Sequence, residues 1–360
     1  MITYLITILL VFGFLCVAQK NIVKSIGPDD ETITKKTSVA TFFFVLAAAT
    51  LILVSGLRYY VGTDYGGYYK GFGRYAASFW PSLKELNEPG IAFIAKIVSF
   101  FSSNGMTFVF VCSFITVTLF LSTIYKNTEM LLLATLLYIF MGCWHGSFNG
   151  VRQYLAAAII FSGVRFIKER KFWKYALIVF IAFLFHASAI IMIFPYFIAY
   201  NRISFKNIAL LIIASIIVLF SFSELLALAG FILRDEISEQ EYITTSVNAL
   251  RIVVAIAPAV FFVFVYSGRP LSKEQRFWMN FLIINGIVMF ATSNSAYFAR
   301  MGIYTAPFSA IGIAELVKGL KPRERKVFPL IIVVAFFLFW VYSIAKSAAL
   351  NNFQWIFSYL

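Results

Sequence analysis

The chain has 360 residues, of which 61% are hydrophobic and 13% are charged, and its mean hydropathy is +0.87. This composition exceeds what one soluble core can bury and indicates an integral membrane protein. The formal net charge of +14 could suggest a nucleic-acid partner. However, the basic residues lie in short loops between apolar runs, as is typical of membrane proteins, so we expect no nucleic acid.

Apolar runs separated by polar loops predict membrane-crossing helices. The first run lacks a positively charged start and a small-residue cleavage site, so we interpret it as a retained span. The chain shows no internal repeat and no second domain, so we expect an all-α polytopic protein with one transmembrane domain over 1–360. The twelve predicted spans are 2–18, 38–57, 105–125, 130–145, 150–167, 172–185, 187–200, 206–222, 251–266, 277–293, 300–317 and 327–345.

The basic residues predict the orientation of these spans. We place the loop of Lys168, Arg170, Lys171 and Lys174 in the cytoplasm, where lysine and arginine are in excess. Alternation of the spans then puts about two thirds of the basic residues on the cytoplasmic side, in agreement with the tendency for positive charge to stay inside. Both termini are therefore predicted to face outward.

Two stretches are ambiguous by length. Residues 89–101 are too short to cross a membrane and connect two outward loops, so we expect an interfacial or re-entrant segment. Residues 172–200 could form one tilted helix. A single crossing, however, would reverse every later loop and expose its basic residues outside. We therefore expect two short helices that meet at His186.

Two long outward segments, 58–104 and the acidic 223–250, are where function is expected. Three helices that enter from the outside begin with an arginine, namely Arg152, Arg251 and Arg300, which adds positive charge to a helix N-terminus. With Arg58 they could form a pocket for a di-anion such as a pyrophosphate. Alternatively, each arginine reaches a lipid headgroup or pairs with the acidic segment.

Arg152 has the strongest polar context. Asn149 is expected to cap the helix by accepting hydrogen bonds from amides of its first turn, with Arg152 and Gln153 inside that turn. The amide donors and the helix dipole favour an anion there. We interpret this helix start as half of a phosphate site.

The start of the first outward segment is rich in tyrosine and glycine and carries Asp64, with Glu88 further along. Tyrosine faces stack on sugar rings, and a carboxylate can bind hydroxyls or take a proton. The alternatives are an interfacial tyrosine belt and a solvated acid.

His186 is a candidate proton acceptor because of its expected depth. Fourteen helical residues rise about 21 Å, short of the roughly 30 Å hydrocarbon core, so His186 should lie below the outer surface. Ionisable groups at such depth are functional candidates, although a neutral histidine bonded to a neighbouring helix is the alternative. His145 is expected in an open outer loop without a special role. No phosphate-binding glycine loop and no metal-ligand motif is present in the sequence, so neither a cofactor nor a metal is expected.

The ordered set of motifs resembles the EpsG family, polytopic proteins of bacterial exopolysaccharide and O-antigen clusters that are similar to Wzy-type polymerases. The motifs are Arg58-Tyr-Tyr-Val-Gly-Thr-Asp64-Tyr, Glu88-Pro-Gly, Phe148-Asn-Gly-Val-Arg-Gln153, Phe185-His-Ala-Ser188 and Arg300-Met-Gly-Ile-Tyr304. The resemblance covers nearly the whole chain and is strongest from 58 to 200.

The resemblance implies a metal-independent membrane glycosyltransferase with a glycosyltransferase C-like membrane fold. It would join oligosaccharide repeat units carried on undecaprenyl diphosphate at the outer face of the bacterial cytoplasmic (inner) membrane. A hydroxyl of one lipid-linked unit would attack the sugar that leaves the diphosphate of another. Besides the lipid bilayer, polysaccharide export and chain-length proteins are conceivable partners.

In this reading His186 is the catalytic base and Asp64 is its rival. A flippase or transporter of lipid-linked oligosaccharides would share the topology but need no proton acceptor. An acyltransferase of polysaccharides would be expected to carry its histidine near the cytoplasmic face. The residues assigned to substrate binding are Arg58, Glu88, Asn149, Arg152, Gln153, Arg251, Arg300 and Tyr304.

Overall fold

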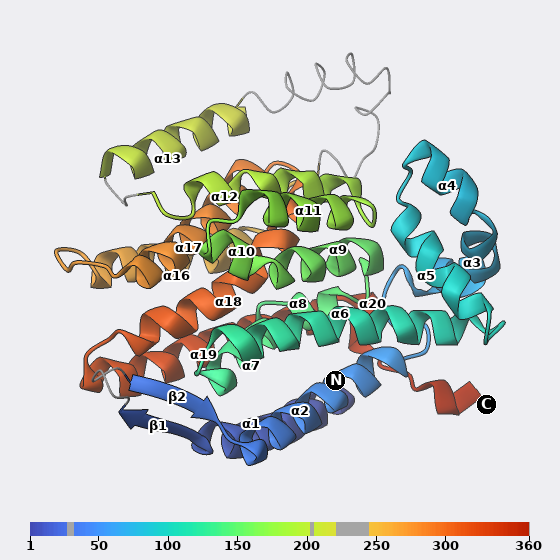
Figure 1. The fold of residues 1–360 in the computed structure, drawn as a ribbon, viewed down its shortest axis with the longest axis horizontal. Coiled ribbons are helices and arrows are strands. Elements are labelled where there is room, and N and C mark those ends of the chain that lie inside the picture. Colours follow the sequence, from blue (N-terminus) through green and yellow to red (C-terminus); the bar gives the residue numbers. More distant parts are fainter. Residues whose placement is uncertain (27–31, 202–204, 221–244, 360) are drawn as a thin grey trace. The chain divides into compact units, whose positions relative to one another are not determined.

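The computed structural model describes residues 1–26, 32–201, 205–220 and 245–359. Figure 1 shows their helices and strands. The chain divides into two compact units, unit 1 with Met1–Met192 and Lys321–Leu360, and unit 2 with Ile193–Leu320. Both units are built mainly of helices, as the sequence predicts. Two compact units can belong to one membrane domain, so the expectation of a single transmembrane domain stays a prediction.

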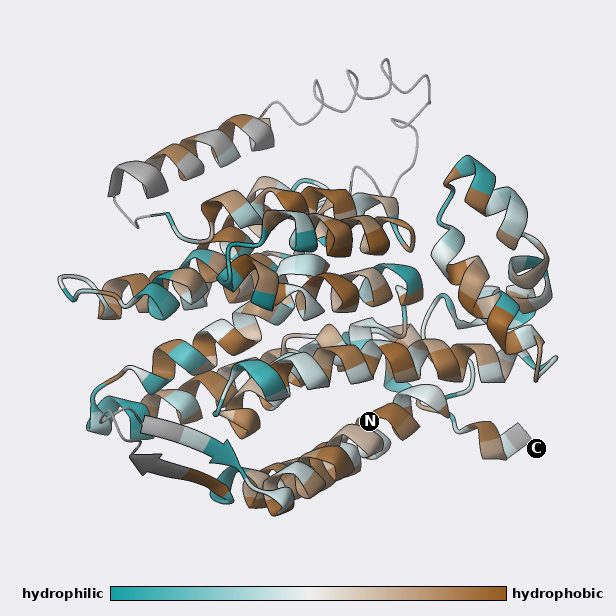
Figure 2. Cartoon of the chain, in the orientation of Figure 1, coloured by the Kyte–Doolittle hydropathy of each residue, from teal (hydrophilic) through white to brown (hydrophobic). Residues whose placement is uncertain are grey.

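Four helices of unit 1 are long and apolar enough to cross a membrane, and they are the only such helices among the described residues. Many of their apolar side chains are exposed, Leu9 and Leu330 among them. Figure 2 shows hydrophobic residues along these helices. Exposed apolar surface of this extent requires a lipid surrounding, so the chain is a helical membrane protein. The four are α1 (Ile2–Lys20), α2 (Ser38–Gly56), α6 (Gly105–Asn127) and α19 (Pro322–Lys346).

A two-stranded antiparallel hairpin, which the sequence analysis did not predict, connects α1 and α2. It comprises β1 (Ile22–Ile26) and β2 (Thr32–Lys36), with Ile22 opposite Lys36. Both segments are rich in β-branched residues, which favour strands over helices. The hairpin falls in the loop predicted to be cytoplasmic.

Several expected spans are shorter than the sequence suggested. The runs 130–145 and 150–167 are each interrupted by a glycine, at Gly142 with a φ of 87° and at Gly163. A left-handed glycine ends a helix without steric cost. Twelve crossings therefore stay a prediction. The resulting helices are α7 (Leu131–Phe140), α8 (Cys143–Gly146), α9 (Val151–Ser162) and α10 (Val164–Lys168).

The hairpin expected around His186 is confirmed. Helix α11 (Phe172–Phe183) ends just before this residue, and the 3₁₀ helix η1 (Ala187–Ile193) begins just after it. The Tyr175 hydroxyl donates a hydrogen bond to the Met192 carbonyl at 2.8 Å. A straight helix would hold these residues about 25 Å apart, so the chain reverses at His186.

The segment 58–104, predicted to face outward, contains three short helices, α3 (Tyr65–Ala77), α4 (Phe79–Glu85) and α5 (Pro89–Ser99). Helices α3 and α5 pack on each other and on α6 around a buried apolar cluster that includes Tyr68, Phe72 and Phe108. With eleven residues, α5 is too short to cross a membrane, as predicted. This packing fixes the start of α5, where Glu88 lies.

The C-terminal segment of unit 1 comprises α20 (Ala348–Asn351) and η4 (Ile356–Tyr359). Its backbone pairs with the chain that leaves α2, because Tyr59 N donates to Gln354 O and Ile356 N donates to Leu57 O. The C-terminal segment thereby holds the start of the segment 58–104.

Unit 2 is organised around α17 (Lys273–Ala291), whose N-terminus is closed by a capping box of Ser272 and Gln275. The Asn280 amide donates to the carbonyls of Ala199 and Asn201, both at 3.0 Å. Most of the acidic segment 223–250 lies outside the described residues. The helices packed on α17 are α12 (Pro195–Ile198), α13 (Phe205–Phe220), α16 (Ala249–Val265) and α18 (Gly302–Lys318) together with the 3₁₀ helix η3 (Phe298–Met301).

Candidate active site

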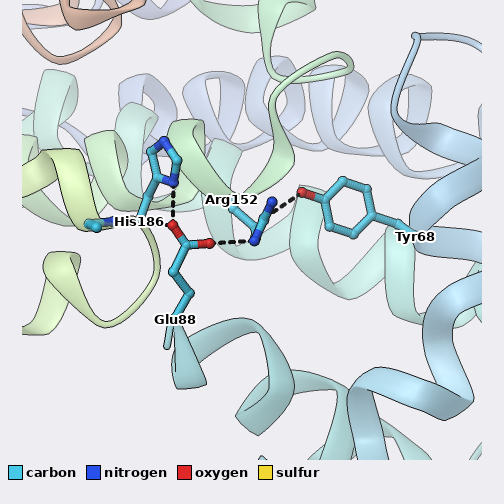
Figure 3. Close-up of polar contacts among 5 residues, drawn as sticks. Tyr68, Glu88, Arg152 and His186 are labelled. Atoms are coloured by element: carbon cyan, nitrogen blue, oxygen red, sulfur yellow. Dashed lines mark hydrogen bonds and ion pairs between the residues drawn. The ribbon is translucent and has the colours of Figure 1, made fainter. Parts of the chain in front are cut away.

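The Glu88 side chain contacts two other segments that lie far from it in the sequence. One carboxylate oxygen lies 2.6 Å from Nδ1 of His186 and accepts the Ala187 amide at 3.2 Å. The other oxygen forms an ion pair and hydrogen bond with Nη1 of Arg152. Figure 3 shows the carboxylate between the imidazole and the guanidinium. Residues that the sequence analysis treated separately therefore form one cluster.

The backbone at Glu88 is held in an unfavourable conformation. Glu88 precedes Pro89 with φ 46° and ψ 51°, in the left-handed region that non-glycine residues rarely adopt. The neighbouring Gly90 donates its amide to the Leu184 carbonyl at 2.8 Å, and a Cβ on Gly90 would meet the Phe185 ring at 2.7 Å. The start of α5 is thus locked against the end of α11. Such local strain is concentrated at functional sites.

Arg152 is held by two partners and still faces solvent. It is the second residue of α9, and its Nε donates to the Tyr68 hydroxyl at 3.2 Å (Figure 3). The side chain of Arg152 is 40% exposed, compared with 15% for Glu88. A guanidinium that is oriented by two partners and open to solvent is well suited to bind an anion.

Tyr68 is a member of the cluster that the sequence analysis did not single out. Burial raises the pKa of its hydroxyl, so Tyr68 stays neutral beside Arg152. Asp64 lies one helical turn earlier, and its carbonyl accepts the Tyr68 amide at 3.2 Å. The sequence signal for Tyr68 was its position four residues after Asp64, which places both residues on one face of a helix.

The charges around Glu88 keep it ionised. Burial alone would raise the pKa of its carboxyl group. The hydrogen bond with His186, the charge of Arg152 and the Ala187 amide outweigh burial, so the pKa of Glu88 is lowered below its ordinary 4.5. An ionised carboxylate of low pKa is a weak base, so Glu88 is better suited to orient its partners than to take a proton.

The contact with Glu88 sets the tautomer of His186. An ionised carboxylate can only accept a hydrogen bond, so Nδ1 of His186 carries a hydrogen, and in the neutral form of the imidazole Nε2 has the lone pair. In Figure 3 the second ring nitrogen points away from Glu88. The His186 side chain is 28% exposed. Nε2 is therefore placed to accept a proton from a bound hydroxyl.

The capping role expected of Asn149 is wrong. Gly150 is the N-cap of α9, and Asn149 Oδ1 instead accepts the Thr63 amide at 2.9 Å. The reason is that α9 begins one residue later than expected and the chain before it packs tightly on the segment 58–64. A Cβ on Gly62 would lie 2.3 Å from the Phe148 carbonyl oxygen. Asn149 thus fastens the loop that leads to α3.

Two other predicted residues lie beside this cluster in different environments. Gln153 follows Arg152 in the first turn of α9, as predicted, and its side chain is buried. Asp64 is partly buried, and its carboxylate accepts a hydrogen bond from the Thr63 hydroxyl at 2.9 Å. Both stay candidates for contacts with substrate.

Arg58 is buried and uses its guanidinium within the protein. It donates to the Val61 carbonyl at 3.1 Å and to the Ser113 hydroxyl at 2.9 Å, and lies 4.5 Å from the Phe148 ring. These contacts favour a structural role for Arg58 over a place in a di-anion pocket.

The remaining predicted residues belong to unit 2. Arg251 is exposed in the first turn of α16, Arg300 is exposed in η3, and Tyr304 is buried in α18. The amide of Val247 donates to the Ser293 carbonyl at 2.8 Å, which places the start of α16 beside the α17–α18 connection. Both arginines therefore lie at one end of unit 2, and their contact with substrate stays a prediction.

His145 was expected in an open loop, and this expectation is wrong. It is buried in the short helix α8 and accepts a hydrogen bond at Nδ1 from the indole of Trp340 at 3.0 Å. The reason is that Cys143–Gly146 forms the short helix α8, whose His145 contacts Trp340 of α19. Across the described part of the chain, no three His, Cys, Asp or Glu side chains are grouped to hold a metal ion.

Fold and cluster together define a helical membrane protein with a partly exposed Arg–Glu–His site. The sequence model of the EpsG family matches residues 41–359, and the chain belongs to this family. The matched region includes every residue of the cluster. No curated protein and no solved structure matches the chain.

Proposed function

We propose that the protein is a membrane glycosyltransferase that polymerises polysaccharide repeat units. It would transfer a glycan from undecaprenyl diphosphate to a hydroxyl of another lipid-linked unit at the outer face of the bacterial cytoplasmic membrane. Membership of the EpsG family supports an exopolysaccharide-related, polymerase-type role. The observation that carries the proposal is that one carboxylate, Glu88, orients both an anion-binding group and a proton acceptor.

Arg152 would bind the diphosphate that leaves. Its Nη1 and Nε contacts with Glu88 and Tyr68 fix the guanidinium plane, and 40% of the side chain stays exposed. Negative charge grows on the diphosphate oxygen as the bond to the sugar breaks. A prepositioned guanidinium stabilises this charge more in the transition state than in the ground state.

His186 would accept the proton of the attacking hydroxyl. The acceptor oxygen forms a bond to the anomeric carbon, the bond from that carbon to the diphosphate oxygen breaks, and its electron pair leaves with the diphosphate. The hydroxyl proton moves to Nε2, and the imidazolium is then stabilised by Glu88 2.6 Å away from Nδ1. Glu88 is therefore assigned to positioning instead of substrate binding, and Asp64 stays the alternative base.

Purified protein in proteoliposomes that contain lipid-linked repeat units tests this function. Polymerisation predicts a ladder of longer glycans on the lipid, whereas a flippase would move the units across the bilayer without lengthening them. His186→Ala and His186→Gln should both lose about 10² to 10⁴-fold in rate, because neither side chain is a base at neutral pH. A ladder of normal intensity with either variant would exclude His186 as the base.

His145→Gln is the matched control, because His145 is the second histidine of the chain and is bonded only within the protein core in this structure. It should lower thermal stability and leave the rate per folded molecule near that of the wild type.

A further inference from the structure

Tyr60 combines an unfavourable backbone with an exposed aromatic side chain. Its φ is 49°, in the left-handed region, and its side chain is 42% exposed. Glycine would adopt this backbone conformation without steric cost, yet a large aromatic residue occupies it. Strained residues of this kind persist where the surrounding structure holds them, and they are concentrated at ligand sites.

The backbone on either side of Tyr60 is fixed by the C-terminal segment. Tyr59 N donates to Gln354 O, and Gly62 N donates to Ala349 O, both at 2.9 Å. These two hydrogen bonds flank Tyr60 and Val61 and restrain the backbone of Tyr60 from relaxing to a more common conformation. The presentation of the Tyr60 ring is therefore built into the fold.

The Tyr60 ring is the outermost member of a tyrosine cluster. Its centroid lies 4.9 Å from that of Tyr59, 5.3 Å from Tyr65 and 6.0 Å from Tyr69. Tyr65 is buried, whereas Tyr59 and Tyr69 are half-buried. The other three rings pack against the Tyr60 ring, which is the most exposed of the four. This arrangement would form an aromatic platform for a planar or ring-shaped ligand.

This platform belongs to the chain segment that also contributes Tyr68 to the proposed site. Tyr60 is followed by Thr63, whose amide is held by Asn149, and then by α3, which carries Tyr68 against Arg152. The segment 60–68 therefore carries both the exposed Tyr60 ring and Tyr68, the partner of the arginine that would bind the diphosphate. In a lipid-linked repeat unit the sugars follow directly after the diphosphate.

We propose that Tyr60 stacks on a sugar ring of the repeat unit whose diphosphate is bound by Arg152. The apolar face of a sugar packs on an aromatic ring, and the strained backbone presents that ring to the glycan. This inference rests on the proposed function, but it concerns glycan binding and is measurable without turnover. The competing role is an aromatic anchor at the membrane interface.

The test compares two ligands by microscale thermophoresis in detergent. One is the pool of lipid-linked repeat units extracted from cells that lack this protein, and the other is undecaprenyl diphosphate without sugar. Tyr60→Leu should raise the Kd for the first about three- to tenfold and leave the second unchanged, while Tyr60→Phe should bind both normally. An equal change for both ligands, or no change for either, would overturn the proposal.

Two further variants separate binding from folding. Tyr60→Gly should melt at a higher temperature than Tyr60→Ala, because only glycine relieves the left-handed strain. Both should lose glycan affinity to the same extent, since both lack the ring. Tyr342→Leu is the control for an exposed tyrosine elsewhere in unit 1, with 39% exposure, and should bind both ligands normally. If glycan affinity follows the melting temperature instead, Tyr60 has only a structural role.

If wild-type protein binds the glycan ligand and shows the Tyr60 dependence but makes no polymer, the proposed function fails and the glycan contact stands. If it makes polymer and Tyr60→Leu binds normally, the glycan contact fails and the proposed function stands.

Discussion

Replacement of Glu88 by glutamine removes the charge that joins Arg152 to His186 and keeps the shape of the side chain. The glutamine oxygen can accept from one partner only, and its NH₂ group then faces a donor of the other. Hydrogen bonds to charged groups contribute about 1.5 to 3 kcal/mol each. Arg152 and His186 are 40% and 28% exposed, so water would replace part of the loss. We expect a destabilisation of about 1 to 3 kcal/mol.

The expected loss of activity is larger than unfolding can explain. Misorientation of a general base typically costs about 10² to 10⁴-fold, which corresponds to roughly 3 to 5 kcal/mol of barrier. A protein stabilised by about 5 to 15 kcal/mol stays mostly folded after a loss of 1 to 3 kcal/mol. Polymerisation per folded molecule, measured from glycan ladders and normalised to the monodisperse fraction, should therefore fall at least about 100-fold.

A double variant shows whether Glu88 acts through His186. In the His186→Ala background, Glu88→Gln should cost much less than it does alone, because the base that it orients is already absent. If the rate of the double variant falls by the product of the two single losses, the positioning role is refuted and independent contacts of Glu88 with substrate are favoured.

The stability difference between wild type and Glu88→Gln should depend on pH. The folded-state pKa of Glu88 is lowered below its ordinary 4.5, so the stabilisation is fully present above that value. It is lost as the pH falls through the lower folded-state pKa. Thermal melting in detergent should show a constant gap between the two proteins above about pH 5.5 that narrows in acid. A gap that persists unchanged in acid would contradict this electrostatic account.

Three further predictions concern the neighbours of Glu88 and the topology. Arg152→Lys should insert normally and lose about 10- to 100-fold in rate, because one ammonium group cannot reproduce the planar contacts with both partners; a normal rate would exclude a specific diphosphate contact. Tyr68→Phe keeps the ring and removes the hydroxyl that accepts from Arg152, so KM should rise about three- to tenfold with kcat nearly unchanged. A fall in kcat with an unchanged KM would refute a role of Tyr68 in orienting Arg152 for substrate binding. A cysteine at Lys84 should react with an impermeant reagent in intact cells, and one at Ser272 only after permeabilisation; the reverse pattern at either position would overturn the orientation.

The fold could be predicted where length and hydrophobicity decide it. The long apolar helices, the short α5 and the chain reversal at His186 follow from the spacing of polar residues and the balance of basic loops. The lengths of α7 and α9 could not be predicted, since they depend on how Gly142 and Gly163 pack against neighbouring chain. Hydropathy alone does not distinguish a glycine inside a span from one that ends a helix.

Three members of the cluster, Arg152, His186 and Glu88, stand out in the sequence as polar residues beside apolar runs, whereas Tyr68 does not. Glu88 lies 64 residues from Arg152 and 98 from His186, so the contacts among them depend on the tertiary fold. Asn149 illustrates the limit, because its side chain could cap its own helix or a neighbouring loop, and only the packing of Gly62 on Phe148 decides between them.

The charge on Glu88 has opposite consequences before and after the proposed reaction. Before it, Glu88 neutralises Arg152 and so weakens the attraction of that arginine for a diphosphate. After it, the same carboxylate stabilises an imidazolium at His186, and Arg152 neutralises the released diphosphate. In the structure the backbone of Glu88 is in the left-handed region and its carboxylate lies between the two groups. A residue that bound substrate alone would not need both partners, which is the physical reason for assigning Glu88 to positioning.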